Sequence, residues 1–155
     1  QVAGLNSTTL NNLSTAQLQS ISTKDVAWVS TGAFSALSTA QLGQLTTLQT
    51  AALLYSQINA LGAAGTTQMQ AISTADIGVL TSAQVAGLNS TTLNNLSSAQ
   101  LQAITTADIP SLSTVAISNL STTQIGQFTS SQINVFTTAE VQAFGTNIQY
   151  LDLSA

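Results

Sequence analysis

Apolar residues in this chain recur in octads, eight-residue units with an apolar residue at the first and sixth positions. One octad reads Leu13-Ser14-Thr15-Ala16-Gln17-Leu18-Gln19-Ser20. We number its positions slots one to eight. Slot one is Leu, Ile, Val or Phe, slots two and three are Ser or Thr, slot five is usually Gln or Asp, and slot six is apolar again. A chain built from one small repeated unit is usually a scaffold, because every unit does the same physical job.

The spacing within the octad predicts one short helix per unit. Apolar spacings of five and then three do not fit the period of two that a strand requires. One long helix fails too, because eight residues advance it by about 800° and its apolar face would drift. With slot two as N-cap, its hydroxyl can accept from the slot-five N–H, and a slot-five Gln, Asp or Glu can reach back, which makes a capping box. Slots one and six then form the hydrophobic staple.

Glycine and proline late in the octad indicate that each helix is short. Gly43 and Gly78 occupy slot seven and Gly87 occupies slot eight, where a helix often ends in glycine. Pro110 at slot seven would cost a continuing helix a hydrogen bond. So short a helix is unstable alone in water and must stack on its neighbours. We therefore expect an all-α solenoid, a superhelix of one- to two-turn helices, with a β-solenoid as the alternative.

The core of such a fold is expected at slots six and one. The slot-six residues predicted to be buried are Leu18, Val26, Phe34, Leu42, Ile77, Val85, Leu93, Leu101, Ile109, Ile117 and Ile125. Their slot-one partners include Leu13, Leu37, Leu80, Leu96 and Leu120. Thr105 is expected to cap the octad that holds Asp108.

The sequence also contains a second repeat, with a longer period than the octad. Residues 1–14 recur without change as residues 84–97, an offset of 84 − 1 = 83, which is ten octads and three residues. The three extra residues predict a bulge or kink near 61–65 within a single octad-repeat domain, 1–155. After residue 144 the phase slips, because Ile148 arrives one slot early. Residue 1 falls at slot five, so we expect parts of two tandem units from a longer array.

Composition narrows the possible partners. Charged residues make up 4% of the chain, against about 25% in a typical soluble domain. A net charge of −4 with one Lys and no Arg argues against nucleic acid and anionic membranes, which need clustered basic residues. The chain has no Cys, and Ser-Thr pairs interrupt every apolar stretch, so disulfides and a membrane-spanning helix are excluded.

Candidate chemistry is sparse. Serines are abundant but there is no His to act as a base, and the only lysine, Lys24, aligns with Ala107 in the second copy. We therefore predict no enzyme and no cofactor. Trp28 could be a binding aromatic, although partial burial between octads is the expectation.

The carboxylates at slot five, Asp25, Asp76, Asp108 and Glu140, have two interpretations. Each can be the capping-box partner of its own helix, which the helix dipole also favours. The alternative is a calcium ladder of Asp76, Asp108 and Glu140, which follow one another at equal intervals of four octads. Calcium needs six to eight oxygen ligands, and one carboxylate in every four octads is few. Exposed slot-three hydroxyls leave ice or glycan binding as further alternatives.

The octads Leu37-Ser38-Thr39-Ala40-Gln41-Leu42 and Phe136-Thr137-Thr138-Ala139-Glu140-Val141 resemble the repeats of very large bacterial secreted proteins. Those proteins are described as haemagglutinin-like or haem-utilisation and adhesion-related exoproteins. The resemblance covers nearly the whole chain. It implies an extracellular or cell-surface location and a role in adhesion or matrix formation. It carries over no functional residues, because the match lies in the scaffold slots.

The leading hypothesis is a structural scaffold, a stalk or a filament that self-associates end to end by packing. The competing hypothesis is a repeat module on the same fold that binds ice, glycan or calcium.

Overall fold

The computed structural model describes residues 6–151, and all regular elements among them are helices. The prediction of an all-α fold is confirmed, and the β-solenoid alternative is wrong, because no strand forms within these residues. The α-helices are α1 (Ser7–Asn11), α2 (Thr15–Gln19), α3 (Thr23–Val26), α4 (Thr31–Ser35), α5 (Thr39–Leu42), α6 (Thr47–Ala51), α7 (Tyr55–Ala64), α8 (Thr66–Gln70), α9 (Thr74–Ile77), α10 (Ser82–Ala86), α11 (Ser90–Asn95), α12 (Ser98–Ala103), α13 (Thr114–Ser118), α14 (Thr122–Ile125), α15 (Ser130–Ile133) and α16 (Thr138–Ala143). Two 3-10 helices, η2 (Ile109–Ser111) and η3 (Gly145–Tyr150), complete the described elements.

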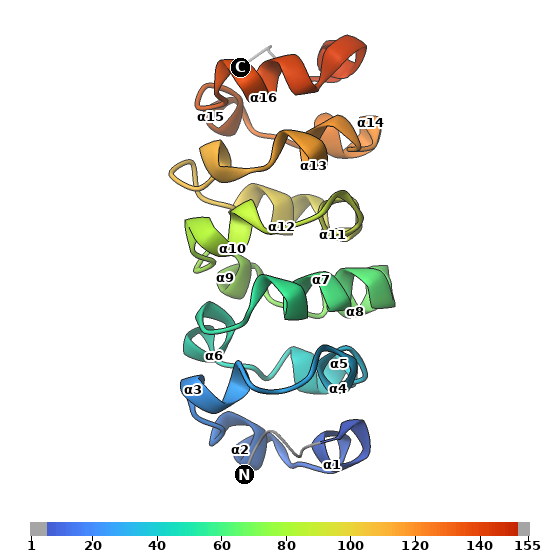
Figure 1. Ribbon diagram of the computed structural model, residues 1–155, viewed down its shortest axis with the longest axis vertical. Helices are drawn as coiled ribbons and strands as arrows, with labels where there is room; N and C mark the ends of the chain where they lie inside the picture. Colours follow the sequence, from blue (N-terminus) through green and yellow to red (C-terminus); the bar gives the residue numbers. More distant parts are fainter. Residues whose placement is uncertain (1–5, 152–155) are drawn as a thin grey trace.

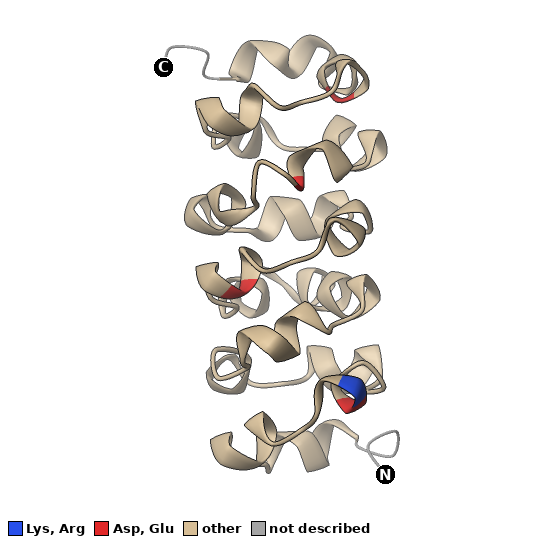
Figure 2. Ribbon diagram, turned by 90° about the vertical axis from the view of Figure 1, so that its left-hand side faces the viewer, with Lys and Arg blue, Asp and Glu red and all other residues tan. Residues whose placement is uncertain are grey.

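The helices stack along one long axis, with α1 and α2 at one end and α16 at the other (Figure 1). The side view shows the same layered column (Figure 2). Neighbours across the layers are mostly three helices apart in the chain: α1 packs on α4, α4 on α7, α9 on α12 and α13 on α16. The chain therefore returns to the same side of the column at regular intervals.

Each regular helix begins where the octad predicts. Slot two is the N-cap in extended conformation and slot three opens the helix, as at Ser14 before α2. The Ser14 hydroxyl accepts from the Gln17 N–H, and the Gln17 side chain accepts from the Ser14 N–H. Complete boxes with a hydroxyl cap recur before α5, α6, α10, α12, α15 and α16. The capping prediction is confirmed for these helices.

The octad with Pro110 departs from the pattern. No α-helix forms between α12 and α13, and η2 takes its place with Pro110 in its first turn. Proline has no N–H to bond four residues back, so the α-helical turn is lost. The Thr105 hydroxyl donates to Asp108 Oδ2, while the Asp108 N–H donates to the Thr105 carbonyl. The prediction that Thr105 caps a helix through its hydroxyl was therefore wrong.

Among the glycines late in the octad, Gly87 allows a close approach between layers, whereas Gly43 leaves room for a Cβ. Gly43 and Gly78 end their helices with φ of −69° and −68°, which any residue adopts. A Cβ on Gly43 would lie 3.4 Å from the Ala71 carbonyl oxygen of the next layer, and one on Gly87 would lie 2.3 Å from the Tyr55 ring. A left-handed helix end does not explain them, because positive φ occurs within residues 6–151 only at Gly65 and Gly145.

The three extra residues at 61–63 lie inside α7, which runs unbroken to Ala64. Leu61 points into the core with no exposed surface. A Cβ on Gly62 would lie 2.3 Å from Thr92 Oγ1, so α7 and α11 meet at this glycine. Gly65, with φ of 127°, separates α7 from α8.

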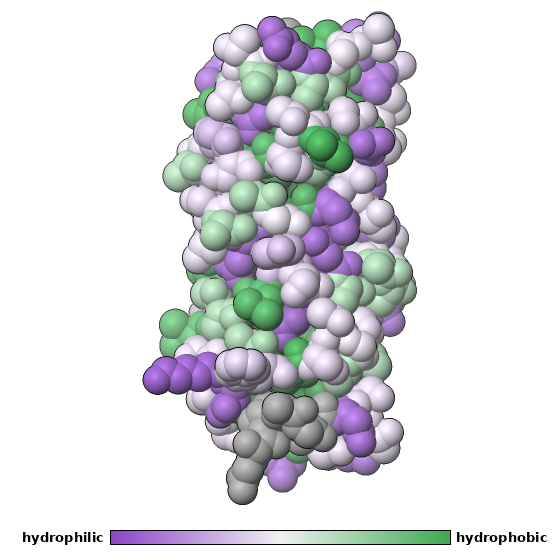
Figure 3. All heavy atoms as spheres, viewed as in Figure 1, coloured by the Kyte–Doolittle hydropathy of each residue, from purple (hydrophilic) through white to green (hydrophobic). Residues whose placement is uncertain are grey.

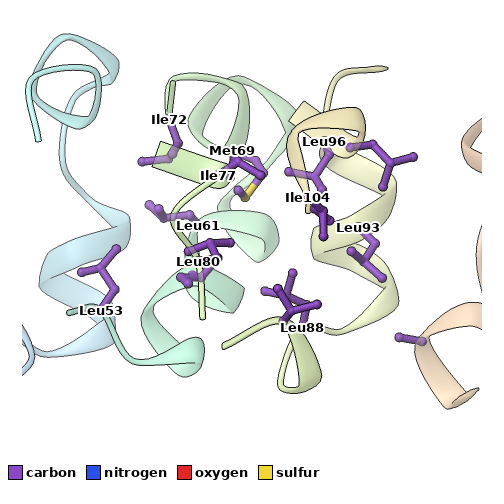
Figure 4. Packing of buried hydrophobic residues seen from close by; sticks show 14 of the residues in the cluster. Leu53, Leu61, Met69, Ile72, Ile77, Leu80, Leu88, Leu93, Leu96 and Ile104 are labelled. Carbon is purple, nitrogen blue, oxygen red and sulfur yellow. The ribbon is translucent and has the colours of Figure 1, made fainter. Parts of the chain in front are cut away.

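The surface in Figure 3 mixes hydrophilic and hydrophobic residues, whereas the interior is apolar and mainly aliphatic (Figure 4), with Phe34, Phe128 and Phe144 also buried. All eleven predicted slot-six residues are buried, from Leu18 to Ile125. The slot-one partners Leu37, Leu80, Leu96 and Leu120 are buried as well, while Leu13 is half-buried. One continuous cluster runs through the column, which confirms the core prediction except at Leu13.

Candidate functional site

The slot-five glutamines join one layer of the column to the preceding one. In α12, Gln100 Oε1 accepts from the Ser97 N–H at 2.9 Å, which completes the capping box. The same side chain donates through Nε2 to the carbonyl oxygens of Met69 at 3.0 Å and Ile72 at 2.6 Å. Gln100 is 2% exposed. One buried amide therefore caps its own helix and bonds twice to the preceding layer.

The arrangement repeats along the column. The carbonyl pairs that receive the amides are Leu10 and Leu13 for Gln41, Leu18 and Ile21 for Gln49, Val26 and Val29 for Gln57, Thr50 and Leu53 for Gln84, Leu93 and Leu96 for Gln124, and Leu101 and Ile104 for Gln132. The partners are 31 and 28 residues earlier, except that Gln84 reaches 34 and 31 residues back across the insertion. We call this set of bonds the amide ladder.

The amide group suits this position chemically. A glutamine side chain has one acceptor oxygen and two N–H donors, so it can serve an N-cap and two carbonyls together. Each receiving pair lies at slots six and one. The slot-six carbonyl also accepts from the slot-one N–H, as Leu101 does from Ile104 at 3.2 Å, whereas the slot-one carbonyl has no backbone donor among residues 6–151. The ladder therefore gives the slot-one carbonyls the partner that they would otherwise lack, and adds a second donor to the slot-six carbonyls.

Slot-seven side chains form hydrogen bonds to the following layer, whereas the slot-five amides bond to the preceding one. Asn11 Nδ2 donates to the Ala36 carbonyl at 2.8 Å, and Asn11 Oδ1 accepts from the Ser38 N–H at 3.1 Å. In the second copy, Asn94 bonds in the same way to the Asn119 carbonyl and the Ser121 N–H. Gln19 and Gln102 donate to carbonyls 25 residues later. The two copies thus use the same contacts.

Two slot-five carboxylates are buried in the place of glutamines. Glu140, 2% exposed, keeps the box, because its Oε2 accepts from the Thr137 N–H at 2.7 Å. Its Oε1 is buried and has no partner among residues 6–151. Asp76, 3% exposed, accepts from the Ser73 hydroxyl through Oδ2, and its Oδ1 is likewise buried without a partner in that range.

Asp108 is half-buried and satisfied on both oxygens, by the hydroxyls of Ser82 and Thr105. Within residues 6–151 no three of His, Cys, Asp or Glu gather where a metal ion could bind. Asp76, Asp108 and Glu140 therefore do not come together as a calcium site, and the few charges lie scattered over the column (Figure 2).

Lys24 and Trp28 both project from the surface. Lys24 is exposed, and Trp28 is 72% exposed. The expectation that Trp28 is partly buried between octads was wrong. Slot eight follows the end of the short helix and faces outward here, so the neighbouring octads leave most of the ring uncovered.

An open groove of about 480 Å³ lies between α5 and α8. Its lining residues are Thr39, Ala40, Thr66, Thr67, Gln70 and Ala71. None of these side chains carries a charge, so the groove offers hydroxyl and amide groups but no acid, base or nucleophile–base pair.

Comparisons with protein families, with curated proteins and with solved structures found no match. Among residues 6–151, no helix has the length and apolar character needed to cross a bilayer.

Reasoning from the octad pattern alone missed the amide ladder, although one signal in the sequence pointed to it. A capping box accepts Glu as readily as Gln, yet slot five holds Gln in most octads and Glu only at Glu140. That bias indicates a need for N–H donors beyond the cap.

Proposed function

We propose that this chain is a length of α-solenoid scaffold, a stalk or filament segment of a bacterial surface protein. The observation that carries the proposal is the amide ladder, which repeats the same layer-to-layer bonds from Gln41 to Gln132 around one continuous core. Each layer contacts only its neighbours, so length can be added without a new fold.

The cellular role rests on the resemblance of the octads to large bacterial exoproteins and on composition. Neutral Ser, Thr, Asn and Gln side chains provide the polar surface, with charged residues at 4%. Hydrogen bonds between neutral groups depend little on salt, in contrast to exposed ion pairs. Such a scaffold suits an extracellular location, where it would hold an adhesive region away from the cell or form matrix.

A second candidate is a binding module on the same scaffold. The groove between α5 and α8 favours it, because hydroxyls and an amide on a neutral surface fit a glycan better than a charged ligand. The function of a scaffold depends on the length of the column, whereas the function of a binding module depends on the groove.

Small-angle scattering tests the scaffold directly. We compare the chain with a variant in which residues 17–99 are duplicated in tandem, which adds one full period of the longer repeat in register. The expected result is a longer maximum dimension with an unchanged cross-sectional radius. A more compact or flexible particle would contradict the proposal. In parallel, thermal unfolding with Ca²⁺ and with neutral oligosaccharides should show no shift, and a saturable shift abolished by Thr67→Ala would favour the binding module.

A further inference from the structure

The slot-five carboxylate Asp76 lies on α9 in the middle of the column, with layers before and after it (Figure 1). The helix α9 packs on α6 of the preceding layer and on α12 of the following one. Asp76 is 3% exposed. Its Oδ2 accepts from the Ser73 hydroxyl, while its Oδ1 is buried and has no hydrogen-bond partner among residues 6–151. One oxygen of this buried carboxylate is therefore unsatisfied.

The amide ladder identifies the backbone groups that face Asp76. In the next octad, Gln84 donates to two carbonyls that lie 34 and 31 residues earlier. The same register places Asp76 opposite the carbonyls of Leu42 (76 − 34) and Leu45 (76 − 31). The packing of α9 on α6, the helix that follows Leu45, agrees with this register.

These two carbonyls receive no amide. Leu42 and Leu45 are buried, at 0% and 6% exposed. The Leu42 carbonyl accepts from the Leu45 N–H at 3.3 Å, and the Leu45 carbonyl has no donor among residues 6–151. The carboxylate oxygen and both carbonyl oxygens therefore meet as three buried acceptors without a donor between them, an arrangement that is costly unless a positive group joins them.

No basic side chain neutralises Asp76. The chain has one Lys and no Arg or His, and this Lys24 is exposed on α3. The helix α6 packs on both α3 and α9, so a whole layer separates Lys24 from Asp76. The buried negative charge therefore has no counter-charge from a side chain of the chain itself.

The length of the Asp76 side chain leaves space for an ion. Gln84 Nε2 lies 3.1 Å and 2.7 Å from its two carbonyl oxygens. Aspartate is shorter than glutamine by one C–C bond of about 1.5 Å, so we expect Oδ1 to lie roughly 4 to 4.5 Å from the Leu42 and Leu45 oxygens. Two oxygens that share an ion at about 2.4 Å each lie up to about 4.8 Å apart. A proton on Oδ1 would not span this separation.

We propose that Asp76 Oδ1 and the carbonyl oxygens of Leu42 and Leu45 bind a monovalent cation, with Na⁺ the ion of matching size. One positive charge neutralises the single carboxylate, and the ion takes the place of the amide donors of the ladder. Ca²⁺ requires six to eight oxygens and would bury a surplus positive charge here. Water can bridge the oxygens, but it leaves the charge of Asp76 uncompensated. The site joins α9 to the preceding layer.

Urea unfolding at constant ionic strength tests the site, with NaCl replaced stepwise by tetramethylammonium chloride, whose cation is too large for the space. For one bound ion, each tenfold rise in Na⁺ above the dissociation constant should raise the folding equilibrium constant about tenfold. A folding constant that does not depend on Na⁺ would overturn the proposal and would leave a water molecule as the partner of Oδ1.

Two substitutions at Asp76 should remove the dependence on Na⁺. Asp76→Asn keeps the size of the side chain and removes its charge. Asp76→Gln supplies an amide that can reach the carbonyls of Leu42 and Leu45, as Gln84 reaches its own pair, so this variant should fold stably without the ion. An Na⁺ dependence as steep in either variant as in the unchanged chain would contradict the assignment to Asp76.

Asp108→Asn is the matched control. It removes a slot-five charge from a half-buried carboxylate whose two oxygens already accept from the hydroxyls of Ser82 and Thr105. This variant should keep the full Na⁺ dependence. Sodium-23 NMR gives a direct readout, because the signal should broaden with the unchanged chain and with Asp108→Asn, and not with Asp76→Asn or Asp76→Gln. Equal loss of Na⁺ dependence in Asp108→Asn and Asp76→Asn would indicate an effect of net charge and would overturn the site.

Discussion

Two consecutive octads, 128–135 and 136–143, place a glutamine and a glutamate in the same buried slot. Both cap their helices: the Thr129 N–H donates to Gln132 at 3.0 Å, and the Thr137 N–H donates to Glu140 at 2.7 Å. Both side chains are 2% exposed. They differ only beyond the cap, where Gln132 Nε2 donates to Leu101 and Ile104, each at 2.9 Å, and Glu140 Oε1 has no partner among residues 6–151.

The difference separates two tasks that one side chain usually performs together. The capping box serves the helix and needs only an acceptor, which Gln and Glu both provide. The ladder joins the layers and needs donors, which only the amide provides. By the register of Gln132, the carbonyls facing Glu140 belong to Ile109 (140 − 31) and Leu112 (140 − 28). The octad of Glu140 therefore lacks ladder bonds, although α16 still packs on α13.

The largest effect should come from removing the N–H donors of a slot-five side chain in the middle of the column, as Glu140 lacks them near its end. Gln100→Glu keeps the cap at Ser97 but removes both donors to Met69 and Ile72. It leaves a buried acceptor, and a charge if ionised, against two carbonyl oxygens. We expect a loss of about 3–5 kcal/mol in the free energy of unfolding. Urea unfolding measures it, with Gln44→Glu as the exposed control, and a loss as small as the control's would mean that the ladder bonds contribute nothing.

Leu101→Ala gives the apolar contribution of the same octad. Leu101 has no exposed surface and sits beside Gln100 in α12. Removing its side chain should cost about 2–5 kcal/mol, through lost burial and the cavity left behind. Calorimetric or urea unfolding checks it. A loss below about 0.5 kcal/mol, which is the range of an exposed substitution, would mean that slot six is not the core of the column.

The converse substitution repairs the defect. Glu140→Gln should restore a donor to the carbonyls of Ile109 and Leu112 while keeping the cap at Thr137. We expect a stabilisation of about 1–3 kcal/mol, the cost of leaving a buried polar atom unsatisfied. Glu140→Ala is the control, because it removes the carboxylate without adding a donor, and it loses the box as well. An unfolding midpoint for Glu140→Gln no higher than for the unchanged chain would show that Oε1 carries no penalty.

The features that depend on residues within one octad, the core positions and the helix starts, could be predicted from the sequence. Slots one and six predict the core, and Ser or Thr followed three residues later by Gln predicts the helix starts, because both signals act within one octad. Leu18 to Ile125 are buried and the boxes form as expected. The signal was strong because every octad repeats it.

The contacts between layers could not be predicted in the same way. Which carbonyl meets Gln100 depends on how far the chain travels before it returns, and no residue within an octad encodes that distance. The ladder bonds span 28 and 31 residues, so the return is longer than three octads and shorter than four. The prediction that Trp28 is partly buried failed for the same reason, because burial at slot eight depends on the neighbouring layer. The excess of Gln over Glu at slot five was the one available signal.

A smaller effect separates the contribution of the cap from that of the ladder. Ser97→Ala removes the hydroxyl that accepts from the Gln100 N–H at 3.2 Å, and leaves the amide's bonds to Met69 and Ile72 possible. It should cost about 1 kcal/mol, the usual value for a lost N-cap.

Thr105→Ala is the matched comparison one octad later. There Pro110 has replaced the α-helix with η2, and the Thr105 hydroxyl donates to the half-buried Asp108 carboxylate instead of accepting from a backbone N–H. Water can replace that donor at a partly exposed carboxylate, so the loss should stay below about 0.5 kcal/mol. Paired unfolding curves measure the difference. Equal losses would mean that the hydroxyl stabilises both octads through something other than the cap, and that cap and ladder are not separable in the way that Gln132 and Glu140 indicate.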